Sequence, residues 1–325
     1  MSKVKKYLQE IWHQYKTIKI LKEQVKTYMR CSEKIVDPQI KVERADYVLA
    51  VAVHSIEKGL GYKDIKEGFG EAKARRICKL MENYLLNGFP EERFGFKEAY
   101  ALMARYIEYK KSVNENIEDI ETWFEKIKSM CTVDMSLNKY QAGGVIYSKE
   151  EIRCDNPDEI IAFKKKCHSI RNYLDIEVKE EDIKSALKLA NLYPSACNRQ
   201  PVSCYYTLDK DEIKTVDSII PGNVPIRGTT PNYLVVTAKM SHFSVDEYNQ
   251  WYINGGIYLG YLREALCIHN IGNCIYQWKF NEDESKVRGI YNIPENEVII
   301  AFVGIGYYDE KSYCIAAQRL SLIHI

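Results

Sequence analysis

The fold of this chain is decided by residues 183–208, IKSALKLANLYPSACNRQPVSCYYTL. Its first part carries apolar residues at helical spacing: Ile183, Ala186, Leu187 and Ala190. This helix must end near Tyr193, because Pro194 disfavours a helical conformation in the residue before it. After the proline-bounded segment 194–201, the run Val202–Leu208 is rich in β-branched and aromatic residues, which is typical of a strand. We therefore expect a helix, a stiff loop and a strand in direct succession.

The second half of the chain combines further strands with helices. Tyr233–Ala238 and Val298–Gly304 are short apolar runs of the kind that fills a covered sheet. Tyr248–Asn270 lies between them and is long enough only for a helix. We therefore expect an α+β arrangement after Pro157, with a central sheet wrapped by helices.

The first half, residues 1–135, contains helical patterns and no convincing strand. In Ala45–Lys58 the apolar residues recur at helical spacing, and Gly59 stands where a glycine would close the helix. Amphipathic helices are also expected over three further segments: Glu71–Leu86, Phe96–Lys111 and Ile117–Met130. Turn residues without periodicity follow. We therefore expect an all-helical N-terminal region, a linker over residues 136–157 and a second domain over residues 158–319.

Composition excludes several classes of protein. The 325 residues are 46% hydrophobic and 28% charged, which is typical of a globular protein of one or two domains. Forty-six Lys and Arg against 45 Asp and Glu give a net charge of +1, so we expect no nucleic-acid scaffold. No apolar run approaches the roughly 20 residues of a membrane span, and the charged start does not resemble a signal peptide. We therefore expect a cytoplasmic protein without membrane insertion.

Ten cysteines form no C-x-x-C pair, which argues against a zinc ribbon or a thioredoxin-type site. In a reducing cytosol most of them are expected to be small buried hydrophobes. The last six residues, 320–325, match what one reading frame of a transposase end sequence used in DNA library preparation would encode. We expect an assembly artefact there, with an ordinary apolar tail as the alternative.

Three segments carry groups that suit a polar ligand. KKKCHSIR, residues 164–171, combines cations with a hydroxyl, as phosphate recognition requires, although a lysine run is more often a solvated helix face. PSACNRQP, residues 194–201, is a stiff loop with amide and hydroxyl groups, or alternatively a capped turn. The expected helix 248–270 contains three glycines despite their cost of about 1 kcal/mol each, which permits close approach of a flat ring or, more commonly, of another helix. These glycines are Gly255, Gly256 and Gly260.

Taken together, these segments resemble the nitroreductase family of flavin enzymes over residues 160–319, half of the chain. H-S-I-R-x-Y resembles that family's opening flavin motif, and P-S-A-C-N-R-Q-P its P-S-x-x-N-x-Q-P signature. N-G-G-I…A-L…I-G-N-C is similar to its interface helix and the following strand. I-P-E-N-E-V-I-I-A-F-V-G-I-G-Y is similar to its final core strand, and Ala317-Gln318-Arg319 to the start of its basic tail.

The resemblance implies an α+β domain with a central mixed β-sheet. It also implies a homodimer that shares two FMN sites, with both subunits building each site. Ser169 and Arg171 match the family's contacts to the phosphate, ribityl chain and pyrimidine edge, and His168 matches a neighbour of these. The remaining implied FMN contacts are Ser195, Asn198, Gln200 and the tail arginine, Arg319.

The chain departs from the family at three places. Cys167 stands where the family usually has an arginine, so Lys165 or Lys166 would have to supply that charge. Val202 stands where tryptophan is common. In the family, a backbone N–H of the loop after the G-x-C strand faces flavin N5, and the corresponding loop here, residues 275–280, cannot be aligned. The residue that faces N5 is therefore not assigned.

The resemblance implies an oxidoreductase that transfers hydride from NAD(P)H through FMN to a small organic acceptor by a ping-pong mechanism. No side-chain nucleophile is required, because the flavin carries the chemistry. Arg171 is the candidate for stabilising the reduced ring, with Arg199 and Arg227 as weaker candidates. Two alternatives remain open: flavin chemistry of another kind, such as reductive elimination or flavin cleavage, and a non-catalytic binding or assembly protein with a degenerate flavin fold.

The helical first half lies outside the family's common core. Its H-S-I-E-K-G-L, residues 54–60, with Gly68 and Gly70, is similar to N-terminal extensions of longer family members linked to polysaccharide gene sets. His54 and Glu57 are one helical turn apart, so they can share a ligand or a proton, or simply a helix-face hydrogen bond. Two residues do not make a metal site, and none is expected.

Overall fold

The computed structural model describes residues 3–32, 38–133, 142–279 and 283–315. The expected tail contact Arg319 and the expected artefact 320–325 lie outside the described residues, as do residues 136–141 of the expected linker.

The chain divides into two compact units that do not follow its order. The sheet unit contains residues 1–29, 154–194 and 201–325. The helical unit contains residues 30–153 together with residues 195–200. The proline-bounded loop therefore belongs to the helical unit, although both of its flanks belong to the sheet unit.

The sheet unit is built on four strands in the order β1-β2-β4-β3. These are β1 (Val202–Tyr205), β2 (Asn232–Lys239), β3 (Gly272–Gln277) and β4 (Glu297–Gly306). All three pairings are antiparallel, and the register of β2 on β4 shifts between Val236 and Thr237. The three strands expected from the sequence are confirmed as β1, β2 and β4, and β1 is shorter than expected.

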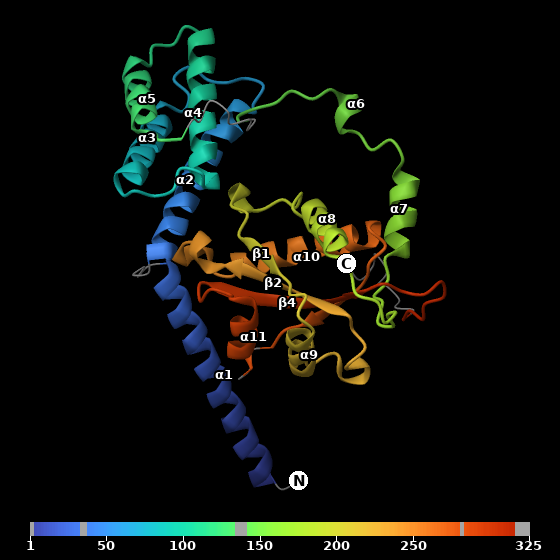
Figure 1. Ribbon diagram of the computed structural model, residues 1–325. Helices are drawn as coiled ribbons and strands as arrows, with labels where there is room; N and C mark the ends of the chain where they lie inside the picture. The colour runs from blue at the N-terminus through green and yellow to red at the C-terminus, as the bar shows by residue number, and fades with distance from the viewer. Residues whose placement is uncertain (1–2, 33–37, 134–141, 280–282, 316–325) are drawn as a thin grey trace. The chain divides into compact units, whose positions relative to one another are not determined.

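Helices cover both faces of this sheet (Figure 1). On one side lie α8 (Glu180–Ala190) and α10 (Gln250–Ile268), and on the other lie α9 (Lys210–Ile219) and α11 (Glu284–Tyr291). Leu234 and Val236 of β2 pack in the core on the α8 and α10 side, whereas the alternate residues Tyr233 and Val235 pack in the core of the other face. All four side chains are fully buried, which explains why β2 is a continuous apolar run.

One glycine of α10 is required for this packing. A Cβ at Gly255 would lie 2.7 Å from Cγ1 of Ile300 on β4, so the helix can approach the sheet only without a side chain there. Gly256 and Gly260 face open space instead. Close packing, here against a strand, thus accounts for one of the three glycines, and the other two lie on the exposed face of the helix.

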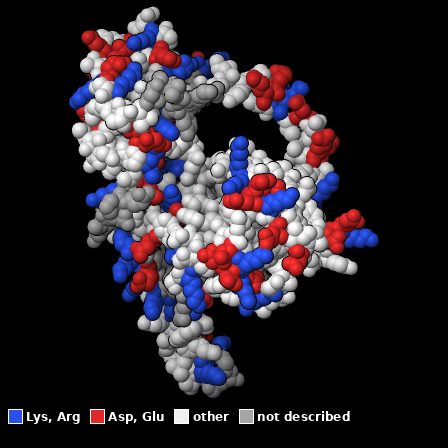
Figure 2. Space-filling view, viewed as in Figure 1, with Lys and Arg blue, Asp and Glu red and all other residues white. Residues whose placement is uncertain are grey.

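The sheet unit also contains α7 (Pro157–Lys166) and most of α1 (Lys3–Ser32). Near the end of α1, Tyr28 donates a hydrogen bond to the carbonyl oxygen of Ser244 and its ring contacts Trp251. The preceding turns of α1 carry exposed apolar side chains. Across the described residues, no helix combines the length and the apolar character that a membrane span needs. Acidic and basic side chains are interspersed over the face seen in Figure 2.

The helical unit contains four longer helices and one short one: α2 (Pro38–Leu60), α3 (Glu71–Leu86), α4 (Phe94–Ser112), α5 (Glu118–Met130) and α6 (Lys149–Ile152). Their apolar faces form one core that includes Val53, Ile77, Leu102 and Phe124. The α+β class with a helical N-terminal region is therefore confirmed.

Gly59 was expected to close α2 as a C-terminal glycine, and this is wrong. The helix continues to Leu60, and Gly59 is not among the residues with positive φ. A Cβ at Gly59 would lie 1.9 Å from the Phe69 ring. The glycine is needed because an aromatic ring packs directly on the helix backbone.

We expect Gly255→Ala to lower the free energy of unfolding by about 1–3 kcal/mol, because the new methyl group overpacks against Ile300. The matched variant Gly256→Ala, one residue along the same helix, should instead raise it by about 1 kcal/mol through helix propensity. Chemical denaturation of the two variants measures both changes. Equal destabilisation by both would show that the space beside Gly256 is filled in solution.

Candidate functional site

The H-S-I-R-x-Y segment of the sheet unit runs along the open edge of β3. The backbone N–H of Ile170 donates to the carbonyl oxygen of Asn273 on β3 at 2.9 Å, and the N–H of Leu174 donates to the carbonyl oxygen of Tyr307 at 2.9 Å. The Tyr173 hydroxyl donates to the Ile170 carbonyl oxygen at 2.7 Å and lies 3.1 Å from that of Gly304 on β4. The segment is thus fixed to the sheet at both ends.

This anchoring holds Arg171 beside two buried polar side chains of β3. Burial raises the pKa of the Cys274 thiol, and the charge of Arg171 acts in the opposite direction. Burial likewise raises the pKa of the Tyr276 phenol, again with Arg171 opposing the shift. Arg171 is half-buried and makes no hydrogen bond or ion pair with any residue in the described ranges. An arginine placed in this way provides an uncompensated fork of donors for an anion.

Ser169 is half-buried next to Arg171, whereas His168 is exposed. The lysines before them are also exposed and form the last turn of α7, where Lys164 pairs with Glu264. Cations at a helix C-terminus are favoured by the helix dipole, so the lysine run fits a solvated helix face. The structure therefore separates the basic octapeptide into a helix end and an edge segment.

Arg263 of α10 is a cation that sequence reasoning missed. Its guanidinium donates to the backbone carbonyl oxygen of Cys167, where the family usually has an arginine. Burial raises the pKa of the Cys167 thiol to about 11, and the charge of Arg263 acts against this shift. The only signal in the sequence was a lone arginine in the largely apolar stretch YLGYLREALCI, residues 258–268.

The motif loop, residues 195–200, has an unusual backbone. Cys197, Asn198 and Gln200 have φ values of 52°, 53° and 47°. These values lie in the left-handed region, which residues other than glycine rarely adopt. Each such residue costs on the order of 1–3 kcal/mol. Inside the loop, the N–H of Gln200 donates to Ser195 Oγ at 2.9 Å, and that of Asn198 donates to the Ser195 carbonyl oxygen at 3.0 Å.

Side chains of the helical unit hold this loop. Asn198 Nδ2 donates to Glu98 Oε1 of α4 at 2.9 Å, and the Arg199 guanidinium lies over the Tyr47 ring of α2, 5.1 Å from its centre. Ser195 is half-buried, Asn198 and Gln200 are exposed, and Arg199 is buried. The structure thus brings together Ser195, Asn198 and Gln200.

Glu98 is the second functional candidate that sequence reasoning missed. Its side chain is buried, and its Oε2 has no hydrogen-bond partner in the described part of the chain. Burial first of all, and then the negative charges of Glu57 and Asp46, raise the pKa of Glu98, whereas the hydrogen bond from Asn198 lowers it; together they raise this pKa to about 8. Glu98 is therefore mostly a neutral acid at pH 7.

Two other expected groups have clear surroundings. His54 Nδ1 lies 3.7 Å from Glu57 Oε2, which fits a helix-face contact. No three His, Cys, Asp or Glu side chains within the described ranges are arranged to hold a metal ion. The exposed guanidinium of Arg227 lies 3.4 Å from both Asn223 Oδ1 and the Ile220 carbonyl oxygen, so it is engaged locally.

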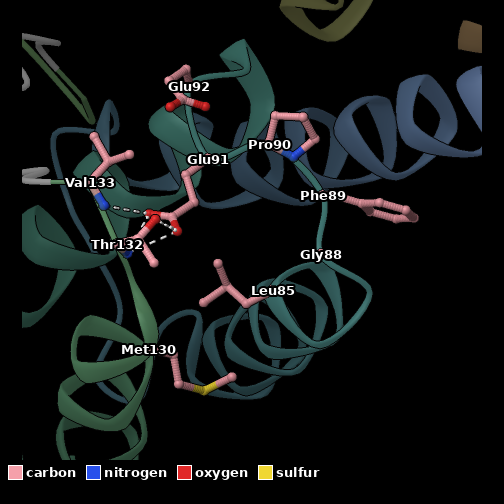
Figure 3. A pocket seen from close by; sticks show the side chains of 9 residues that line it. All are labelled: Leu85, Gly88, Phe89, Pro90, Glu91, Glu92, Met130, Thr132 and Val133. Carbon is pink, nitrogen blue, oxygen red and sulfur yellow. Dashed lines mark hydrogen bonds between the residues drawn. The ribbon is translucent and has the colours of Figure 1, made fainter.

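The helical unit has a surface cavity of about 360 Å³ between α3 and the end of α5 (Figure 3). Glu91 lines it, and its carboxylate accepts hydrogen bonds from the N–H groups of Thr132 and Val133 and from the Thr132 hydroxyl. A second cavity of about 500 Å³ contains Glu115, which accepts from Lys110 Nζ at 2.5 Å. Both carboxylates are committed to local structure, which makes these cavities weaker candidates.

The comparisons with known proteins concern the second half of the chain. The sequence profile of the nitroreductase family matches residues 165–251. A protein of Archaeoglobus fulgidus that carries the name NADH dehydrogenase/NAD(P)H nitroreductase is 29% identical over 157 residues, which are 47% of this chain and 88% of that protein.

Solved structures of similarly named proteins also match. One from Parabacteroides distasonis is 18% identical, with a TM-score of 0.45, over 51% of this chain and 96% of that chain. An FMN-dependent nitroreductase from Clostridium difficile is 22% identical, with a TM-score of 0.43, over 51% of this chain and 96% of that chain.

We expect the buried Glu98 to make stability depend on pH. In the unfolded chain its proton is lost near the ordinary pKa of 4.5, whereas the folded chain retains it until about pH 8. This contribution is complete below pH 4.5 and is lost as the pH rises through about 8. Glu98→Gln, which mimics the neutral acid, should melt close to the wild type near pH 5 and about 5 °C above it near pH 8.5.

Thermal unfolding followed by circular dichroism across this pH range measures the effect. The matched control is Glu108→Gln on the exposed side of the same helix, and it should follow the wild type at every pH. A Glu98→Gln curve parallel to the wild type would show that Glu98 titrates normally.

Proposed function

We propose that this chain, whose residues 165–251 match the profile of the nitroreductase family, is an FMN-dependent oxidoreductase. It transfers hydride from NAD(P)H to a small organic acceptor in a ping-pong sequence. The observation that carries the proposal is Arg171, a half-buried arginine without an acidic partner in the described ranges, held at the sheet edge by the family's opening motif. Bound FMN would supply the hydride chemistry itself.

The residues present fit a phosphorylated ring. Arg171 and Ser169 offer a charged fork and a small hydroxyl side by side, which is a donor set for phosphate or for an anionic pyrimidine edge. The resemblance implies further FMN contacts from Ser195, Asn198 and Gln200 of the motif loop, and we keep these three residues in the proposal. Arg263 supplies positive charge at Cys167, where the sequence had indicated a missing cation. We assign FMN binding to the same residues as the sequence resemblance did, with Arg171 as the main electrostatic contact.

Arg263 bears on the two alternatives. A degenerate, non-catalytic fold was suggested by Cys167, where the family usually has an arginine, and by the unaligned loop 275–280. The hydrogen bond of Arg263 to the Cys167 carbonyl oxygen argues against the first of these two reasons. Flavin chemistry of another kind uses the same residues, so product analysis of a turnover reaction distinguishes it from simple hydride transfer.

We also propose a homodimer. On α1, side chains at alternating spacings of four and three residues are exposed by between 45% and 67%: Val4, Leu8, Ile11, Tyr15 and Ile18. Such spacing is typical of a helix that packs against a partner, and an exposed apolar stripe of this length favours association. The cytoplasm is the compartment we propose, since all ten cysteines are free, as in a reducing environment.

Arg171→Ala should weaken FMN binding by about 10–100-fold, because a charged hydrogen-bond donor contributes about 1.5–3 kcal/mol. Fluorescence titration of the apoprotein with FMN measures the affinity. Arg227→Ala is the matched control, because Arg227 is exposed and its hydrogen bonds within the described ranges go to nearby residues. The affinity of this variant for FMN should match that of the wild type. Wild-type affinity in Arg171→Ala would remove Arg171 from the site, and a wild-type chain that binds no FMN would refute the flavin proposal.

The double variant Ile11→Asp/Ile18→Asp should convert the dimer into a monomer, because four buried charges would then face one another across the α1 contact. Light scattering coupled to size exclusion measures the mass. Gln9→Asp, on the polar face of α1, is the control and should leave the dimer intact. A dimer that survives the double variant must be held by another surface.

A further inference from the structure

The motif loop requires support from outside itself. Three of its residues have left-handed backbone conformations without being glycine, so an unsupported segment would relax to other conformations. Its internal hydrogen bonds, among them that from the Gln200 N–H to Ser195 Oγ, close the turn. Within the loop, the Asn198 side chain has one long contact, with Gln200 Nε2 at 3.4 Å, and Asn198 is one of the FMN contacts that the resemblance implies.

The helical unit provides the missing constraint. Glu98 Oε1 accepts the amide N–H of Asn198 at 2.9 Å, and Gln200 Nε2 lies 3.4 Å from Asn198 Oδ1. The amide of Asn198 is therefore held on one side by α4 and on the other by its own loop. Arg199, stacked over Tyr47 of α2, fixes the next residue to the same unit.

The surroundings of Glu98 are unfavourable for a carboxyl group unless it has a specific partner. Its side chain is 6% exposed, and Oε2 has no partner in the described ranges. Two acidic side chains of α2, Glu57 and Asp46, act on it with their negative charges. Asp46 in turn accepts from the Gly95 N–H at 2.8 Å.

Among the described residues, the basic side chains Arg93 and His54 pair with these acids and not with Glu98. Arg93 Nε lies 3.6 Å from Asp46 Oδ2, and His54 lies 3.7 Å from Glu57. For the stability of the folded chain alone, an apolar side chain at position 98 would therefore be as good as a buried acid or better. The one bond that an apolar residue cannot make is that to Asn198.

We propose that Glu98 is a positioning residue, which fixes the amide of Asn198 and thereby the motif loop of the proposed FMN site. The helical N-terminal region thus serves as the support of this loop. This inference rests on the proposed function only for the role of the loop in binding FMN, because the contact between Glu98 and Asn198 is independent of any ligand. Glu98 itself is not assigned a contact with the flavin or the substrate.

The experiment compares Glu98→Leu, which removes the acceptor, with Glu98→Gln, which retains it, in the full-length chain. Glu98→Leu should weaken FMN binding about tenfold, equivalent to about 1.4 kcal/mol, and should increase hydrogen exchange of the amides of residues 195–200. Glu98→Gln should restore both to within about twofold of the wild type. Glu108→Leu, on the exposed side of the same helix, is the control and should change neither.

A double-mutant cycle with Asn198→Ala tests the pairing. If Glu98 acts through Asn198, the double variant Glu98→Leu/Asn198→Ala should bind FMN no more weakly than the worse single variant. Additive losses would overturn the proposal, and so would failure of Glu98→Gln to restore the affinity.

Hydrogen exchange separates this inference from the proposed function. A chain that binds no FMN, but whose loop loses protection in Glu98→Leu and regains it in Glu98→Gln, refutes the flavin site and supports the positioning contact. If Glu98→Leu does not fold, Asn198→Ala alone should expose the same amides. Unchanged exchange in residues 195–200 of that variant would overturn the proposal.

Discussion

Burial of both faces of the β2–β4 pair is the constraint on which the proposed site depends. Tyr233 and Leu234 point to opposite faces, and each meets a complete apolar core. A slip of one residue would exchange the two faces, so the register is strongly determined. The backbone groups at the open edge of β3 and at the end of β4 are consequently fixed in space, and the segment that carries Arg171 is bonded to them. The position of this cation follows from sheet packing and not from its own contacts.

Arg171 makes no ion pair with the residues that the structure describes, and this has a physical implication. Several lysines and arginines elsewhere in the chain pair with acids, as Lys164 does with Glu264 and Arg288 with Glu284. Such exposed or partly exposed pairs contribute little to stability. Partial burial of a guanidinium costs hydration free energy, and without a partner no ion pair or hydrogen bond offsets this cost. A bound anion would offset it. A phosphorylated ligand at this edge would supply that anion, which connects the fold to the proposed chemistry.

In the helical unit, Glu98 is a buried ionisable group that the proposed function also uses, and it is an acid where Arg171 is a base. Glu98 is a buried acid beside two other acids, and its neutral form is favoured because burial raises its pKa. In either protonation state, Glu98 Oε1 can accept the hydrogen bond from Asn198, and an apolar side chain cannot. Binding loops are generally held by a rigid scaffold, and here the scaffold comes from a distant part of the chain. Under the proposed function, the helical extension would act by holding the loop 195–200, which belongs to the same unit.

The sequence by itself determined the elements and their type. Helical periodicity located α3 at its observed ends, and β-branched runs located β2 and β4, because local side-chain patterns report which face is buried. The motifs around Ser169, Ser195 and Asn198 indicated a resemblance to the nitroreductase family and, through it, the candidate contacts. Tertiary structure alone decided that residues 195–200 join the helical unit, that Arg263 reaches Cys167 and that Glu98 holds Asn198. These contacts link residues about 100 positions apart in the chain, and no local pattern encodes such a distance. The same holds for the pKa of Glu98, since it depends on burial and on neighbours that only the folded chain brings together.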